Sequence, residues 1–370
     1  MLRWLEQPSV YHVKNDELYE IDESAFKFLC ECADRGALSD DVEFTSYCLS
    51  EGILSETPQK ISSRCIRKSP VPSLRYLELL ITDRCNLRCR HCYLGESRAK
   101  ELGLDQIIRV LEEFNALQGL RVLISGGEPL VHREFDGLND YLSGYPLRKV
   151  LFSNGLLIDR KTLKNLNVDE IQISIDGLGD SHDALRGRGV FDRAMSAVRL
   201  ALDNGFDVAV STMIHPGNLG EFERMDELFR KMGVRNWIVD VPCLSGRMLD
   251  NTALSLKPDV AGKYLGYGYG EGLHGGGEGF ACGLHLVSVL PDGHIAKCAF
   301  YSDRPLGHIS EGLEKCWKRL VPLRLADIKC SSCDVLDACR GGCRYRAELS
   351  GDPLGRDFYR CAAFGVEEET

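Results

Sequence analysis

Three cysteines stand close together in one short segment, Cys85-x3-Cys89-x2-Cys92. Thiolates ligate iron–sulfur clusters and zinc. Three of them can hold three irons of a cubane [4Fe–4S] cluster and leave the fourth iron open, so that it can bind a small molecule. A structural zinc ion takes four protein ligands, and only His91 lies nearby as a fourth. A cluster is therefore the favoured interpretation, and a zinc knuckle is the alternative.

Seven further cysteines lie in the C-terminal part of the chain. Their spacing is C-x10-G-x4-C, then C-x2-C-x5-C-x3-C, then one more, over Cys282, Gly293, Cys298, Cys330, Cys333, Cys339, Cys343 and Cys361. Such a series suits iron–sulfur clusters or one or two zinc ribbons.

The composition narrows the class of protein. The chain has 370 residues, sixteen of them cysteine, and a formal net charge of −10. An acidic surface repels phosphate backbones, so we expect no nucleic-acid partner. No run of about 18 apolar residues predicts a membrane span, and the N-terminus lacks a signal-peptide pattern. We therefore expect a cytoplasmic protein with no membrane partner, in which grouped cysteines indicate metal rather than disulfides.

Strand-like and helix-like segments alternate between residues 75 and 250, which predicts an α/β fold with a parallel sheet or barrel. The expected strands are 77–82, 121–125, 149–153, 170–175, 208–213 and 236–241. Helices are expected at 104–118, 190–204 and 219–232. Six such units form an incomplete eight-unit barrel, and parallel barrels place active sites at the carboxyl ends of their strands.

Candidate site residues follow these expected strands. The cysteine segment comes after the first strand. Gly126, Gly127 and Glu128 follow the second, and paired glycines let a backbone approach a ligand closely. Asn154 follows the third strand. Ser174 and Asp176 end the fourth, and Arg186 comes shortly after them.

Three regions are expected: a small N-terminal α/β domain at 1–70, the barrel at 75–265 and a cysteine-rich domain at 266–370. In the first, 10–13 and 17–21 predict a hairpin closed at 14–16, followed by helices at 23–33 and 40–49. The third region begins with a glycine-rich stretch, 266–279, and has little apolar periodicity. Metal is therefore expected to hold the third region together.

These motifs together resemble the radical S-adenosylmethionine (SAM) superfamily. Cys85, Cys89 and Cys92 match its CxxxCxxC motif, with His91 before the last cysteine. Residues 126–129 resemble its GGEP motif, and 182–187 resemble an HDxLRG segment. The C-terminal series resembles the seven-cysteine pattern of SPASM domains. The resemblance implies a partial (β/α)6 barrel, a [4Fe–4S] cluster that cleaves bound SAM to a 5′-deoxyadenosyl radical, and hydrogen abstraction from a substrate.

The resemblance also implies roles for the strand-end residues. Gly126, Gly127 and Glu128 would contact the methionine part of SAM. Ser174, and less clearly Asn154 and Asp176, would contact its ribose and adenosine or else shape the strand ends. Arg186 is the candidate clamp for the SAM carboxylate, because guanidinium geometry matches a carboxylate. Arg247 is the next candidate.

By the same resemblance, Cys282, Cys298 and Cys343 hold a first auxiliary cluster, and a second is held by Cys330, Cys333, Cys339 and Cys361. Both are expected to be [4Fe–4S]. Gly276 occupies the position where some relatives carry a further ligand. The first auxiliary cluster therefore has an open iron or takes Cys243 or Cys316, unless these are buried apolar cysteines. The four cysteines before the barrel are taken as structural: Cys30, Cys32, Cys48 and Cys65.

Three functions compete. The first is peptide or protein modification, for which 1–70 would be a PqqD-like peptide-binding domain or a structural cap. The second is modification of a small molecule or a cofactor precursor. The third, a non-enzymatic electron carrier, needs no SAM site. Ala299 stands where anaerobic sulfatase maturases carry an aspartate base, which argues against that activity. Reduced ferredoxin or flavodoxin is the expected electron donor.

Overall fold

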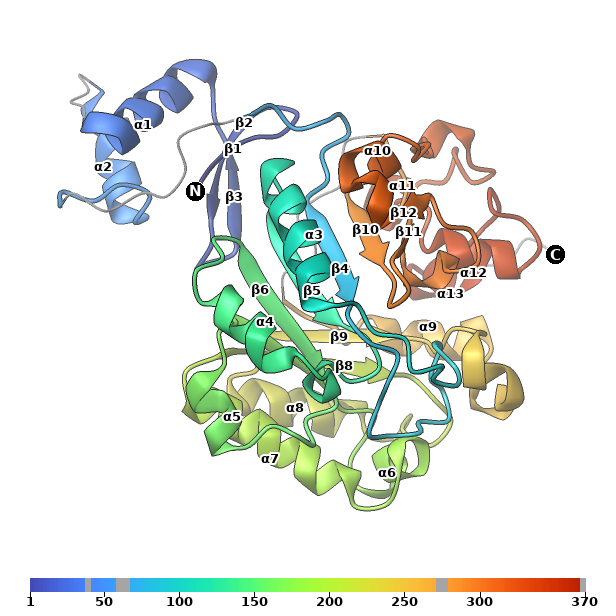
Figure 1. The fold of residues 1–370 in the computed structure, drawn as a ribbon. Helices are drawn as coiled ribbons and strands as arrows, with labels where there is room; N and C mark the ends of the chain where they lie inside the picture. The colour runs from blue at the N-terminus through green and yellow to red at the C-terminus, as the bar shows by residue number, and fades with distance from the viewer. Residues whose placement is uncertain (37–40, 58–66, 271–278, 367–370) are drawn as a thin grey trace.

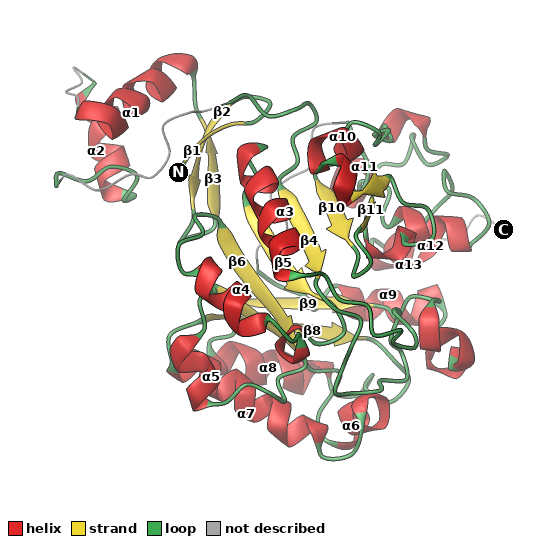
Figure 2. Ribbon diagram, in the orientation of Figure 1, coloured by secondary structure: helices red, strands yellow, loops and turns green. Residues whose placement is uncertain are grey.

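The computed structural model describes residues 1–36, 41–57, 67–270 and 279–366. It is a mixed α/β structure with a nine-stranded sheet in the order β12-β11-β10-β4-β5-β6-β7-β8-β9 (Figures 1 and 2). The central strands β4 to β9 are all parallel, as the partial-barrel expectation requires. These strands are β4 (Tyr76–Leu80), β5 (Arg121–Ser125), β6 (Arg148–Ser153), β7 (Glu170–Ser174), β8 (Asp207–Met213) and β9 (Asn236–Asp240).

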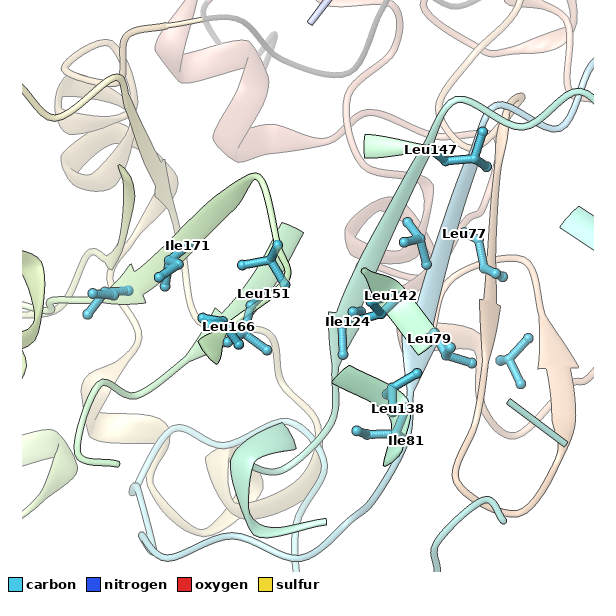
Figure 3. Close-up of a cluster of buried hydrophobic side chains, with 14 of the residues drawn as sticks. Leu77, Leu79, Ile81, Ile124, Leu138, Leu142, Leu147, Leu151, Leu166 and Ile171 are labelled. Carbon is cyan, nitrogen blue, oxygen red and sulfur yellow. The ribbon is translucent and has the colours of Figure 1, made fainter. Parts of the chain in front are cut away.

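Helices follow the parallel strands, and those that cover the outer face are α3 (Leu104–Ala116), α4 (Phe135–Leu142), α5 (Arg160–Asn165), α7 (Val190–Asp203) and α8 (Phe222–Met232) (Figure 2). Helix α6 (Asp180–Arg186) lies at the carboxyl ends of the strands, and α9 (Pro258–Leu265) packs on the C-terminal helix α13 (Phe358–Ala363). Successive side chains of a strand point to opposite faces. Leu77 and Leu79 of β4 accordingly pack with Leu138 of α4 in the main core, shown in Figure 3. The opposite face of β4 carries Tyr76, Glu78 and Leu80, and Leu80 belongs to a second, smaller apolar cluster.

The N-terminal residues form a separate three-stranded antiparallel sheet, in the order β1-β2-β3. Its elements are β1 (Leu2–Trp4), β2 (Pro8–His12), β3 (Glu17–Glu20), α1 (Glu23–Arg35) and α2 (Val42–Ser50). The predicted hairpin and both helices are confirmed, β1 was not predicted, and residue 40 of the second expected helix is outside the described residues. Asp16 closes the hairpin with a φ of 64°.

This hairpin turn is joined to the amino-terminal end of the barrel by buried charges. Asp16 pairs with Arg121 and with Arg148, where the Nε–Oδ2 distance is 3.3 Å. Arg148 also donates to Glu170 at 2.8 Å and to Asp207 at 2.7 Å. The N-terminal domain therefore closes the end of the barrel opposite the carboxyl ends of the strands.

The C-terminal region is less independent than its composition suggests. Its strand β10 pairs in parallel with β4, and β11 and β12 extend the same sheet. Val287 and Val289 of β10 belong to the main core. The elements are β10 (Leu286–Val289), β11 (His294–Ala296), β12 (Gly307–His308), α10 (Leu313–Trp317), α11 (Leu336–Cys339), α12 (Arg344–Leu349) and α13 (Phe358–Ala363). Pairing with the main sheet therefore stabilises part of this region, and the expectation that metal holds the region together stays a prediction.

Short 3₁₀ helices complete the described fold. They lie at Pro129–Val131, Gly246–Asp250, Thr252–Leu254, Ala299–Tyr301, Ile309–Glu311 and Leu325–Asp327. Within the described ranges, no helix has the length and apolar character needed to cross a bilayer.

Candidate functional site

The cysteine segment forms a loop at the carboxyl end of β4, and the two glycines after β5 hold it in place. The amide of Gly127 donates to Thr82 O at 2.8 Å, and that of Glu128 donates to Arg84 O at 2.9 Å. A Cβ at Gly126 would lie 2.4 Å from Thr82 O, and one at Gly127 would lie 2.2 Å from Arg84 O. Both positions therefore need glycine because they touch the loop backbone itself. Their contact with SAM stays a prediction.

Glu128 lies beneath this loop and is fully buried. Its carboxylate accepts from Ser153 Oγ at 2.9 Å and from the amide of Asn154 at 2.8 Å. Burial raises the pKa of Glu128 to about 7 despite these hydrogen bonds. The residue thus ties the end of β5 to the end of β6.

Asn154 reaches from β6 to the first cysteine. Its Nδ2 donates to Asn86 Oδ1 at 2.7 Å and lies 3.9 Å from Cys85 Sγ. The amide of Leu87 donates to the same sulfur at 3.4 Å. N–H donors around a thiolate sulfur are typical of iron–sulfur sites.

A buried ion pair supports the second cysteine. Arg186 Nε donates to Asp176 Oδ2 at 2.5 Å, and Arg186 Nη1 lies 4.0 Å from Cys89 Sγ. His91 Nε2 is 3.5 Å from Asp176 Oδ2. Burial alone would raise the pKa of Asp176, but Arg186, His91 and His182 hold it well below its usual range. The pair brings the end of β7, helix α6 and the cysteine loop together.

Asp176 is fully buried, and protein groups engage its carboxylate and its carbonyl. The amide of Met213 donates to Oδ1 at 2.8 Å, while Asn218 Nδ2 and His215 Nε2 contact its carbonyl at 2.9 and 3.0 Å. Of the two roles expected for Asp176, this geometry favours shaping the strand end. The adenosine contact stays a prediction, as it does for half-buried Ser174, which lies at the same edge.

Arg247, the second candidate for the SAM carboxylate, is directed at the cysteine loop. Its Nε donates to Cys89 O at 2.9 Å and its Nη1 to Gly95 O at 2.6 Å, while its amide donates to Cys92 O at 2.9 Å. The loop after β9 therefore supports the cysteines through their backbone. Arg186 Nη1 lies 4.0 Å from Cys89 Sγ, whereas the guanidinium of Arg247 donates to backbone carbonyls of the loop.

Two buried histidine ring nitrogens at this edge are available to hydrogen-bond a small molecule. His91 Nδ1 and His182 Nε2 are buried without a hydrogen-bond partner in the described part of the chain. Burial lowers the pKa of both imidazoles to about 4, so each is neutral at pH 7. A neutral imidazole nitrogen can accept or donate one hydrogen bond. Together with the three cysteines, this donor set fits a cluster and a polar small molecule such as SAM.

Sequence reasoning missed several contributors to this edge. His215 and Asn218 lie after β8 and have no motif of their own. Glu78 lies within β4, bonds to Ser288 Oγ and has a pKa raised by burial. The sequence could have indicated Glu78, because it is a charged residue inside an otherwise apolar strand.

The C-terminal cysteines surround a cavity of about 420 Å³. Cys282, Cys298 and Cys343, the set expected for the first auxiliary cluster, all line it, and Cys339 does too. The cavity is also rich in cations, contributed by Lys297, Arg340, Arg344, Arg346 and Arg360. Thiolates and cations around one space fit an anionic iron–sulfur cluster.

The other C-terminal cysteines form a neighbouring group. Burial raises the pKa of Cys361 to about 11, and the Cys339 and Cys330 thiols add to this, so the three are neighbours. Cys333 lies one turn from Cys330, to whose carbonyl its amide donates at 3.1 Å. The two ligand sets stay predictions.

The two candidates for an additional ligand differ. Burial raises the pKa of Cys243 to about 12, and the nearby Cys343 thiol contributes. Cys316 instead donates to His308 O at 3.6 Å within the core. Cys65 and Gly276 lie outside the described residues. In the ranges that are described, no three His, Cys, Asp or Glu side chains form a site for a single metal ion.

Sequence comparisons agree with the resemblance. A family model described as the radical SAM superfamily matches residues 79–230. The mycofactocin maturase MftC of Mycolicibacterium smegmatis is 30% identical over 310 residues, covering 74% of this chain and 79% of that protein. An AdoMet-dependent heme synthase of Nitratidesulfovibrio vulgaris is 24% identical, covering 77% of this chain and 92% of that protein.

Solved structures share the fold. Streptococcus suis SuiB bound to precursor peptide SuiA superposes with a TM-score of 0.72 at 16% identity, covering 98% of each chain. The enzyme anSMEcpe with bound AdoMet has a TM-score of 0.63 at 19% identity, covering 79% of this chain and 95% of that one. The first likeness therefore spans nearly the whole chain.

Proposed function

The chain belongs to the radical SAM superfamily as an enzyme of its SPASM group, and we propose that it modifies a peptide or protein by radical chemistry. Its catalytic [4Fe–4S] cluster would be held by Cys85, Cys89 and Cys92. A cluster held by these cysteines would supply the electron for reductive cleavage of SAM, which would in turn allow a hydrogen to be abstracted from the substrate.

The observation that carries this proposal is the convergence of Arg186 and Asn154 on the cysteine loop, which itself contains His91. Arg186 brings a buried positive charge within 4.0 Å of Cys89 Sγ. Asp176 pairs with Arg186 through Nε, so the Nη nitrogens of the guanidinium can donate to a second anion, and we assign that place to the SAM carboxylate. Gly127 and Glu128 would face the methionine amino group. Ser174 would face the ribose and adenosine.

We also propose two auxiliary clusters, with the ligand sets expected from the sequence. The cation-lined cavity around Cys282, Cys298 and Cys343 supports the first. The proximity of Cys330, Cys339 and Cys361 supports the second. Reduced ferredoxin or flavodoxin would supply electrons.

Two features support a peptide as the substrate. Relatives include a mycofactocin maturase, and SuiB is known bound to a precursor peptide. In addition, β3 is an edge strand of the N-terminal sheet, and an extended peptide can add to such an edge. The same domain also caps the barrel through Asp16, so the two expected roles are compatible. The relatives named heme synthases favour a small-molecule substrate as the second candidate.

The decisive experiment is anaerobic reconstitution followed by iron, zinc and SAM-cleavage assays. We expect roughly 10 to 12 irons per chain, the range for three multi-iron clusters, and 5′-deoxyadenosine after reduction. About four irons with stoichiometric zinc would contradict the auxiliary clusters. Incubation with a candidate precursor peptide, and separately with an iron porphyrin, distinguishes the two substrate classes by the mass of the product.

A further inference from the structure

Arg344 is a buried cation with unsatisfied donors. Its exposed fraction is 1%. Nη1 donates to Pro353 O at 3.3 Å and to Gly355 O at 2.8 Å. Nε and Nη2 are buried and have no hydrogen-bond partner in the described part of the chain. Burying N–H donors without acceptors is costly, so these two nitrogens call for an acceptor that the polypeptide does not supply.

The side chain stands between the two cysteine groups. Arg344 follows Cys343 directly and lines the same cavity as Cys339. A Cβ at Gly341 would lie 3.5 Å from Arg344 Nη2, which places this nitrogen beside the loop that joins the two cysteines. Cys343 is proposed for the first auxiliary cluster and Cys339 for the second.

Another, half-buried cation of the cavity is already neutralised. Arg346 donates to Asp240 at 2.6 Å and to Asp357 at 2.8 Å. The hydrogen bonds of Arg344 go to carbonyl oxygens, and the nearby Asp352 carboxylate is paired with Lys329 at 2.7 Å, so the Arg344 charge can still act on an anion in the cavity.

We propose that Arg344 donates from Nε and Nη2 to sulfur atoms of the auxiliary clusters beside it and thereby raises their reduction potentials. The inference rests on the proposed pair of auxiliary clusters. Reduction adds negative charge to a cluster, and hydrogen bonds or cations at its sulfurs stabilise that charge. Arg344 is thus a positioning and tuning residue, with no part in binding SAM.

The test is a redox titration, monitored by electron paramagnetic resonance, of reconstituted wild type, Arg344→Lys and Arg344→Met. We expect at least one auxiliary potential to become more negative, with a larger shift in the Met variant than in the Lys variant. The potential of the cluster at Cys85, Cys89 and Cys92 should not move. Arg319→Met is the matched control, because it removes an exposed cation that pairs with Glu311 in the same region.

Each outcome separates tuning from a purely structural role. The proposal is overturned if both Arg344 variants keep their full iron content and their auxiliary potentials do not change. Arg344 would then serve only to fix residues 353–355 through its hydrogen bonds to their carbonyls. If both variants lose auxiliary iron but their cluster-free forms unfold at the temperature of cluster-free wild type, the contact with the clusters is supported. Iron loss together with a lower unfolding temperature of the cluster-free form counts against it. Wild type that binds no auxiliary iron refutes the proposed clusters instead.

Discussion

Arg186 and Asp176 form a buried ion pair, Nε to Oδ2 at 2.5 Å, directly beside the cysteine loop. The Asp176 carboxylate fixes the guanidinium by one edge, while Nη1 remains 4.0 Å from Cys89 Sγ. A planar guanidinium can bind a carboxylate with one edge and present its other nitrogens to a second anion. The pair therefore orients a cation toward the place where the SAM carboxylate is proposed to bind.

Replacing Arg186 by lysine should weaken SAM binding without loss of iron. A single ammonium group cannot both pair with Asp176 and reach a second anion. We expect a loss of roughly 1–3 kcal/mol in SAM binding, the range for charge-assisted hydrogen bonds. Anaerobic calorimetry with SAM measures this, and iron analysis checks cluster assembly.

Arg188→Lys is the matched control, because Arg188 lies two residues away and is exposed. It should bind SAM like wild type. If Arg186→Lys and Arg186→Ala also bind SAM like wild type, Arg186 does not contact the ligand. If they lose iron, Arg186 supports the cluster loop through Cys89 instead.

Changing Cys85, Cys89 and Cys92 together to alanine should abolish SAM cleavage and leave the auxiliary clusters in place. The two groups of ligands are separate, because the C-terminal cysteines line their own cavity. Iron should fall by about one third, as expected for loss of one of three similar clusters. The measurements are iron content and chromatography of 5′-deoxyadenosine. Continued production of 5′-deoxyadenosine by this variant would refute the catalytic assignment.

The sequence predicted the barrel well because its signals are local. The strand Arg121–Ser125 was predicted with its observed bounds, since a short apolar run precedes the glycine pair. In contrast, β10 was not predicted as part of the sheet. Its Ser288 bonds to Glu78 of β4, 210 residues away, and no local pattern reports such a pairing.

The candidate site was likewise predicted only in part, because some of its contacts have no local sequence signal. The roles of the site residues stay predictions, but the structure brings two of them, Asn154 and Arg186, to the cysteine loop. The partner of Arg186 was not predicted, because Asp176 and Arg186 meet only once β7 and α6 are packed. Likewise, the sequence offered Arg247 as a clamp, although its nitrogens hold the loop backbone. Motifs identify residue types, while tertiary packing decides where each charge points.

A substitution of Arg148 tests whether its ion pairs hold the N-terminal domain on the barrel. It is 1% exposed and faces the carboxylates of Asp16, Glu170 and Asp207. Arg148→Ala removes this cation from the buried carboxylates of Asp16 and Glu170, so unfolding free energy should fall by roughly 3–5 kcal/mol. Denaturant unfolding measures the change.

Arg235→Ala is the control, since Arg235 pairs with the same Asp207 at 2.7 Å but its side chain is 32% exposed. An exposed pair contributes little, so we expect a loss of about 1 kcal/mol or less. Equal losses in both variants would show that burial of the Arg148 network is not what makes it strong.

Glu128 should make stability depend on pH. Burial raises its pKa from 4.5 to about 7, so the folded protein keeps a proton that the unfolded chain releases above pH 4.5. Between these values the unfolded chain binds fewer protons, and the unfolding free energy therefore decreases as pH rises. Above pH 7 both states are ionised at this site and its contribution is constant. The total decrease should be roughly 2–4 kcal/mol.

Glu128→Gln removes this titration while keeping an oxygen that can accept from Ser153 Oγ. Its unfolding free energy should consequently change less between pH 4.5 and 7 than that of wild type, as measured by denaturant unfolding at several pH values. Glu112→Gln, at an exposed position on α3, should keep the wild-type pH profile. If the Glu128 variant also keeps that profile, the carboxyl is already ionised across this range, and its hydrogen bonds to Ser153 and Asn154 outweigh burial.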